Sequence, residues 1–258
     1  MNDRIKHAFF ENKAFIPFVT CGDPDISLTE DLVLAMEEAG ADLIELGLPF
    51  SDPIAEGPVI QQADERALAS GFKVEQLFSL VTRLRSHTEI PLVCMTYLNP
   101  VYRYQKERFL VSAKQAGLDG LIIPDLPFEE QDEIKGSCQA NAITLISMIA
   151  PTSEKRIIAV SQQSEGFLYC VSSLGVTGMR DNLNDRAKEM VALAKASCDT
   201  PCAVGFGIHT PEQAHHIADY ADGIIVGSAI VNMIAEQGKK SVKPVSQYVR
   251  EMKQAISG

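Results

Sequence analysis

The sequence predicts a (β/α)8 barrel, and two observations support this prediction. Eight short runs rich in Ile, Val, Leu and Phe show little polar alternation, which is typical of parallel strands buried on both faces. Phrases such as AGADLIEL, AGLDGLII and YADGIIVG repeat the order of helix end, tight turn and next strand. Eight such units suit a single barrel domain over residues 1–258. An open doubly wound sheet is the alternative, but no early strand is followed by its GxGxxG turn.

The apolar runs place the expected strands in order along the chain, at uneven spacing. The segments that follow the second and the sixth runs are longer than one loop and one helix require. We therefore expect long loops after strands two and six, at the C-terminal face of the barrel, where long loops usually carry function. The expected strands are Ala14–Thr20, Asp42–Leu46, Pro91–Tyr97, Gly120–Pro124, Ile143–Ile149, Gly166–Ser172, Cys202–Phe206 and Gly223–Val226.

Helices are expected between these strands, and an extra helix is expected before the first one. Residues Asp3–Asn12 are predicted to form a helix that closes the bottom of the barrel, and Pro244–Ile256 the last helix. The segment SLTEDLVLAMEEAGA has an apolar stripe of helical spacing. Its expected N-cap is Ser27 or Thr29, and Gly40 is expected to stop it.

Composition narrows the class of protein. The formal net charge of −11 argues against a non-specific nucleic-acid binder or a binder of anionic membranes. No apolar run approaches the length of a membrane-spanning helix, and the N-terminus lacks the apolar core of a signal peptide, so we expect a soluble, cytoplasmic protein. The six cysteines and five histidines have no metal-ligand spacing, so no metal site is predicted.

Glycine motifs follow the last three expected strands and indicate a phosphate site. They are GVTG at Gly175–Gly178, GFG at Gly205–Gly207 and GSA at Gly227–Ala229. Barrel enzymes often hold a phosphate with these loops and the N-terminus of a short helix, where backbone N–H groups approach the anion. We expect Ser228 to cap a helix from Ala229. No lysine or arginine lies inside the motifs, so the cradle would be mostly backbone; ordinary turns are the alternative.

Two carboxylates lie near the end of the second strand, at Glu45 and Glu56. If Leu43 and Glu45 point into the barrel, burial among apolar side chains would raise the pKa of Glu45 and suit it to proton transfer near neutrality. Glu56 lies in the following loop. One acid on a strand beside another on a loop is suited to paired acid/base chemistry. The alternative for Glu45 is a salt-bridged structural glutamate.

Seven segments carry a resemblance that covers nearly the whole chain. The most specific is LIELGLPFSDPIAEGPVIQ, and the others are FIPFVTCGDP, MTYLNP, LIIPDLP, VSSLGVTG, GFGI and DGIIVGSAIV. Together they resemble the tryptophan synthase alpha chain family. The resemblance implies a cofactor-free lyase that cleaves indole-3-glycerol phosphate to indole and glyceraldehyde 3-phosphate by a retro-aldol reaction.

The resemblance also implies roles for individual residues. Glu45 would be the acid/base at C3 of the indole and at the glycerol hydroxyl, and Glu56 would hold the indole N–H. The family more often has aspartate at position 56. The extra methylene of glutamate therefore changes how far the carboxylate extends toward the indole N–H. Positions matched to the phosphate site are Gly178, Gly207, Gly227 and Ser228; those matched to the indole pocket are Phe18, Ile60, Met95 and Tyr169; Thr177 matches a residue that steadies the loop acid on closure.

A partner is implied as well. The family pairs with a tryptophan synthase beta chain in an α2β2 tetramer, the beta chain carries pyridoxal phosphate, and indole passes between the two sites. Two alternatives remain open: a catalytically weakened subunit that mainly activates the beta chain, and another phosphosugar barrel isomerase. The residues expected to face the beta chain are Pro49, Asp52, Pro53 and Asn99, with Pro100 beside them.

Overall fold

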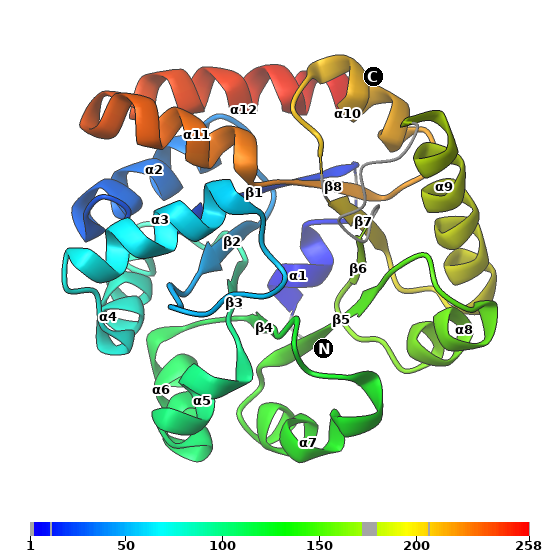
Figure 1. Cartoon of the computed structure of the whole chain (residues 1–258), viewed down its shortest axis with the longest axis horizontal. Coiled ribbons are helices and arrows are strands. Elements are labelled where there is room, and N and C mark those ends of the chain that lie inside the picture. The colour runs from blue at the N-terminus through cyan, green and yellow to red at the C-terminus, as the bar shows by residue number, and fades with distance from the viewer. Residues whose placement is uncertain (1–2, 11, 172–179, 206, 258) are drawn as a thin grey trace.

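Eight parallel strands close into a barrel in sequence order, which confirms the predicted fold class (Figure 1). The computed structural model describes all residues except 1, 2, 11, 172–179, 206 and 258. Because β1 also pairs with β8, the open-sheet alternative is wrong. The strands are β1 (Ala14–Thr20), β2 (Ile44–Gly47), β3 (Leu92–Met95), β4 (Gly120–Ile122), β5 (Thr144–Ile149), β6 (Leu168–Val171), β7 (Cys202–Gly205) and β8 (Gly223–Val226).

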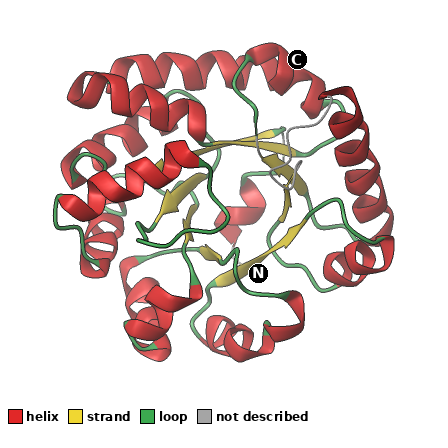
Figure 2. Cartoon of the chain, in the orientation of Figure 1, coloured by secondary structure: helices red, strands yellow, loops and turns green. Residues whose placement is uncertain are grey.

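Helices surround this ring of strands (Figure 2). No helix in the described part of the chain is long and apolar enough to cross a membrane. The helices are α1 (Asp3–His7), α2 (Ile26–Glu38), α3 (Pro58–Ala69), α4 (Val74–Leu84), α5 (Leu98–Arg103), α6 (Lys106–Ala116), α7 (Asp132–Ala140), α8 (Glu154–Gln162), α9 (Arg180–Ser197), α10 (Pro211–Ala218), α11 (Ser228–Gln237) and α12 (Val242–Ile256), with short 3-10 turns η1 (Phe128–Glu130) and η2 (Gly238–Lys240).

The first helix closes one end of the barrel, but it is shorter than predicted. Ile5 of α1 is fully buried and packs with the side chains of the barrel interior. The helix ends at His7 rather than Asn12, because the N–H groups of Phe9 and Phe10 bond to carbonyls only three residues back. This tighter turn brings the Phe9 ring to 5.5 Å from the ring of Phe167, between centroids.

The segment between β2 and β3 is long mainly because it holds two helices. A loop over residues 48–57 follows β2, and α3 and α4 fill most of the rest. After β6, the helix α9 accounts for 18 residues, and the expected long loop at 172–179 lies outside the described residues. The loop at 48–57 is the one that carries Glu56.

The start of α2 differs from the prediction. Its N-cap is Asp25, whose carboxylate accepts the Leu28 N–H at 2.9 Å and the Ser27 hydroxyl at 2.7 Å. These bonds lower the pKa of Asp25 to about 2. Ser27 therefore supports the cap instead of providing it, and the predicted stop at Gly40 is confirmed by its φ of +103° directly after the C-cap.

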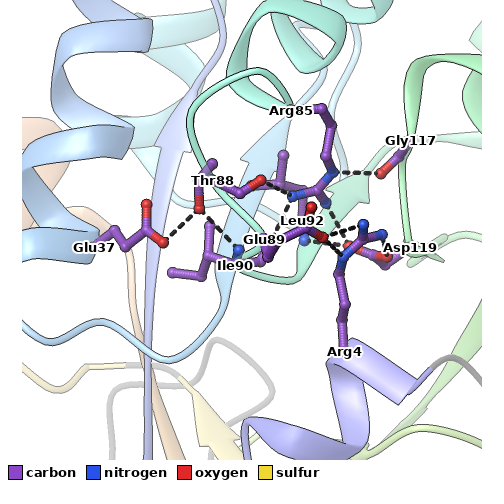
Figure 3. A network of polar contacts seen from close by, with 9 residues as sticks. All are labelled: Arg4, Glu37, Arg85, Thr88, Glu89, Ile90, Leu92, Gly117 and Asp119. Atoms are coloured by element: carbon purple, nitrogen blue, oxygen red, sulfur yellow. Dashed lines mark hydrogen bonds and ion pairs between the residues drawn. The ribbon is translucent and has the colours of Figure 1, made fainter.

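Ion pairs stabilise the end of the barrel that α1 closes (Figure 3). The Asp119 carboxylate is fully buried, and it accepts bonds from Arg85 at 2.6 Å, Arg4 at 3.2 Å and the Leu92 N–H at 2.8 Å. Arg4 also contacts Glu89. Because Arg4 lies on α1 and Asp119 directly before β4, this network ties the closing helix to the sheet.

Candidate active site

A cavity of about 140 Å³ opens at the carboxyl ends of the strands. Parallel barrels place their active sites at this end, since the loops that follow the strands converge there. The cavity brings together nearly all of the predicted site residues that the structure describes, whereas Gly178 and Thr177 lie outside the described residues. Its lining consists of Phe18, Glu45, Ala55, Glu56, Gly57, Ile60, Met95, Pro124, Met148, Tyr169, Gly207, Ile208, His209, Ile225, Gly227, Ser228 and Ala229.

Glu45 is a buried acid with no hydrogen-bond partner among the described residues. It is 1% exposed and lies on β2 in register with Phe18 of β1 and Val93 of β3. Leu43 belongs to the barrel interior and Ile44 to the outer core, so the predicted alternation is confirmed. Neither Glu45 oxygen has a hydrogen bond or ion pair within the described chain, which contradicts the salt-bridged alternative.

The environment of Glu45 prepares it for proton transfer. Burial, with a smaller contribution from the charge of Glu56, raises the pKa of Glu45 to about 8. An isolated carboxylate in an apolar site is costly, so the neutral acid is favoured at neutral pH. A carboxyl with such a pKa can give up a proton and take one back near pH 7, which is what a general acid/base needs.

Glu56 is held by Tyr97, a residue that the sequence analysis did not single out. The Tyr97 hydroxyl donates to the Glu56 carboxylate and accepts the N–H groups of Ile54 at 3.0 Å and Ala55 at 2.8 Å. The Tyr97 ring lies 5.1 Å from the Phe50 ring. One buried side chain therefore anchors the loop that carries Glu56. The signal in the sequence was its position directly after the third strand, in MTYLNP.

The pKa of Glu56 is raised by burial, while the hydrogen bond from Tyr97 opposes that rise. Tyr97 bonds Oε2 of Glu56, and the backbone N–H groups of Ala55 and Glu56 also bond the carboxylate and favour its charged form. Glu56 also lines the cavity. The side chain of glutamate, one methylene longer than that of aspartate, reaches the Tyr97 hydroxyl, which the loop backbone holds in place.

A third acid, Asp64, lies behind Glu56 on α3 and was also missed. Its side chain is 4% exposed, and burial together with the charge of Glu56 raises its pKa to about 8. The Phe50 N–H bonds its carboxylate and favours the charged form. Nearby, Asp23 forms a two-pronged ion pair with Arg66, at 2.8 and 2.7 Å. Asp64 therefore links α3 to the start of the Glu56 loop.

Large apolar side chains form the middle of the cavity, and two glycines make room for them. Phe18 lies over Gly47, where a Cβ would come within 2.4 Å of the Phe18 Cζ. Tyr169 lies over Gly205, where a Cβ would come within 2.8 Å of the Tyr169 hydroxyl. Such contacts are far below van der Waals distance, so both positions require glycine for these ring positions. Ile60 and Met95, which the resemblance assigned to an indole pocket, also line the cavity.

The described residues of the predicted phosphate cradle also line the cavity. Gly207 adopts a φ of +71°, and Gly227 is the N-cap of α11. The prediction that Ser228 caps a helix from Ala229 is wrong, because the Val231 N–H bonds the Gly227 carbonyl at 3.0 Å and begins the helix one residue earlier. The free N–H groups of this first turn can bind an anion.

The residues expected to face a partner are only partly exposed. Asp52 and Asn99 are exposed and Pro53 is half-buried, whereas Pro49 is buried within the chain. Ile54 is 80% exposed beside them, and the sequence analysis did not include it in this surface. No group of three His, Cys, Asp or Glu side chains that could hold a metal occurs among the described residues.

Comparison with known proteins identifies the family. The family model described as "Tryptophan synthase alpha chain" matches residues 6–257. The tryptophan synthase alpha chain of Caldanaerobacter subterraneus subsp. tengcongensis is 46% identical over 246 residues, covering 95% of this chain and 94% of the relative.

Solved structures agree with this match. The tryptophan synthase subunit alpha of Legionella pneumophila str. Paris superposes with a TM-score of 0.90 at 38% identity, covering 99% of this chain and 98% of that one. A chain of the tryptophan synthase complex from Pyrococcus furiosus gives a TM-score of 0.86 at 36% identity, covering 94% of this chain and 98% of that one. The chain belongs to the tryptophan synthase alpha chain family.

Proposed function

We propose that this chain cleaves indole-3-glycerol phosphate to indole and glyceraldehyde 3-phosphate by a retro-aldol reaction. The observation that carries the proposal is Glu45, which is buried in an apolar cavity, has no hydrogen-bond partner among the described residues and has a pKa raised to about 8. Glu56, large apolar side chains and the glycines of a backbone cradle line the same cavity. A substrate that has an apolar ring and a phosphate suits this set of groups.

The proposed reaction transfers one proton from the glycerol hydroxyl to C3 of the indole and leaves Glu45 protonated as it began. Glu45 gives its proton to C3 of the indole ring, which becomes a cationic indolenine. The Glu56 carboxylate accepts a hydrogen bond from the ring N–H and stabilises that charge. Glu45, now ionised, takes the proton of the hydroxyl on the adjacent carbon. The carbon–carbon bond breaks as the aldehyde forms, its electrons restore the ring, and Glu45 is protonated again.

The phosphate of the substrate would be held mainly by backbone N–H groups. Gly207, Gly227 and Ser228 surround that end of the cavity, and the N-terminus of α11 favours negative charge. Gly178 and Thr177 remain proposals of the resemblance alone. We assign no cofactor to this chain.

We further propose a tryptophan synthase beta chain as the partner, in an α2β2 tetramer in the cytoplasm, with pyridoxal phosphate bound by the beta chain. The name of the family and the solved complex of a relative support this partner. The exposed Ile54 and Asp52 lie on the loop after β2, and the exposed Asn99 lies in the first turn of α5 after β3. Indole would leave the cavity toward the partner on this side.

The test is release of indole from indole-3-glycerol phosphate, measured with and without a beta chain. We expect release, and we expect Glu45→Gln to lower it by about 10²- to 10⁴-fold, the usual contribution of a general acid/base. Glu38→Gln, an exposed glutamate on α2, is the matched control and should retain full activity. No release by folded protein in either condition would overturn the proposed reaction. Full release by Glu45→Gln would overturn the role of Glu45 alone.

A further inference from the structure

The charges that line the cavity do not balance those of a phosphorylated substrate. Among the described lining residues, Glu45, Glu56, Tyr169 and His209 can ionise, and His209 is the one of them that can carry positive charge. A phosphate monoester carries about −1.5 to −2 charges near neutrality. The phosphate would enter a cavity that already contains two acids. Any cationic group near the phosphate cradle would therefore strengthen binding.

His209 follows Gly207 by two residues, and its backbone is fixed from two sides. Its N–H donates to the Gln213 Oε1 at 2.9 Å, and its carbonyl accepts the Tyr248 hydroxyl at 3.2 Å. Gln213 belongs to the capping box of α10 and Tyr248 to α12, so two helices hold the residue in place. It lines the cavity together with Gly207, Gly227 and Ser228.

The imidazole itself has no hydrogen bond or ion pair with any residue that the structure describes. Other groups that can ionise near it are Glu212, in the first turn of α10, and Tyr248 on α12. Glu45, Glu56 and Tyr169 line the same cavity. A histidine whose backbone is fixed, and whose imidazole bonds no described residue, can bind the anion that the neighbouring cradle would hold.

We propose that His209 is a phosphate-binding residue of this site, whose imidazole supplies the positive charge that the backbone cradle lacks. The inference rests on the proposed function. A neutral imidazole supplies no such attraction, so the contribution to binding requires the charged form. Since the side chain is exposed, we expect a gain in affinity of about threefold to tenfold when it is charged, below that of a buried pair.

The test compares the wild-type chain with His209→Gln, which keeps a hydrogen-bond donor but cannot be charged. The dissociation constant of glycerol 3-phosphate, the phosphate end of the proposed substrate, is measured by calorimetry at pH 6.5 and pH 8.5. We expect the variant to bind about threefold to tenfold more weakly at pH 6.5 and within about twofold of wild type at pH 8.5. The ratio of the two proteins cancels the ionisation of the phosphate itself.

Steady-state kinetics give a second readout. Loss of a contact to an unreactive part of the substrate should raise KM for indole-3-glycerol phosphate and leave kcat unchanged. His87→Gln is the matched control, since His87 is an exposed histidine that precedes β3 at the opposite end of the barrel. Equal affinities of wild type and His209→Gln at both pH values, with intact turnover, would overturn the role of His209 alone. Absence of both binding and turnover in the wild-type protein would overturn the proposed function together with it.

Discussion

Two buried carboxylates at opposite ends of the barrel, Asp119 and Glu45, have opposite environments. Asp119 is fully buried and is surrounded by Arg85, Arg4 and the Leu92 N–H. Glu45 is 1% exposed, and its oxygens bond to no group in the described chain. The first charge is compensated and contributes to the structure. The second is left uncompensated, which costs stability and produces a proton donor at the cavity.

Removal of the two acids should therefore have opposite effects on stability, and this is the largest effect that we predict. Asp119→Asn leaves Arg85 and Arg4 without their shared carboxylate, and breaking such a buried pair costs about 3–5 kcal/mol. Glu45→Gln removes an acid whose charged form is disfavoured by burial, so its free energy of unfolding should equal or exceed that of wild type. Urea unfolding of the three proteins measures both. Equal losses in the two variants would contradict the distinction between the two ends.

The pH dependence of stability should report Glu45 directly. In the native chain its pKa is raised to about 8, from 4.5 for an unperturbed glutamate. Between these values the folded chain holds a proton that the unfolded chain has released. Its contribution to stability is therefore present below about pH 4.5 and is lost as the pH rises toward about 8.

The measurement is the free energy of unfolding of wild type and of Glu45→Gln between pH 5.5 and pH 7.5. The difference between them should change in favour of the variant with rising pH, by at most about 1.4 kcal/mol per pH unit. Asp64, whose pKa is also raised to about 8, is present in both proteins and cancels. Parallel stability curves would show that Glu45 is solvated or paired in solution.

Glu56 is intermediate between Asp119 and Glu45, since it is half-buried and has the neutral partner Tyr97. Tyr97→Phe removes the hydroxyl that orients Glu56. Glu56→Asp shortens the side chain, so that its carboxylate is drawn away from the Tyr97 hydroxyl. We expect each to lower kcat by about tenfold, about 1.4 kcal/mol. Because both act on one contact, the double variant should lose little more than either single one.

Tyr102→Phe is the matched control, since the Tyr102 hydroxyl also donates to a glutamate, Glu133, but at an exposed position. It should leave kcat unchanged. Strictly additive losses in the double variant would show that Tyr97 acts independently of Glu56. Higher activity of Glu56→Asp would show that the loop does not require the additional methylene.

Local sequence patterns predicted the barrel well because each strand is recognisable on its own. The limits of β1 and β8 agree with the predicted runs, and the orientation of Glu45 followed from the alternation of Leu43 and Ile44. Helix ends were predicted less well. The start of α11 depends on which carbonyl accepts the first helical bond, and several neighbouring residues could have served.

The sequence by itself determined the fold, the two acids and the glycine motifs, because these depend on short-range periodicity and on residues with narrow conformational or chemical uses. Only the tertiary structure placed Tyr97 against Glu56, Asp64 behind the loop and His209 beside the cradle. The same holds for the contrast between Glu45 and Asp119, which look alike as single acids in the sequence. Closure of the barrel brings distant segments together, and the neighbours acquired in that way decide whether a buried charge is neutralised or left reactive.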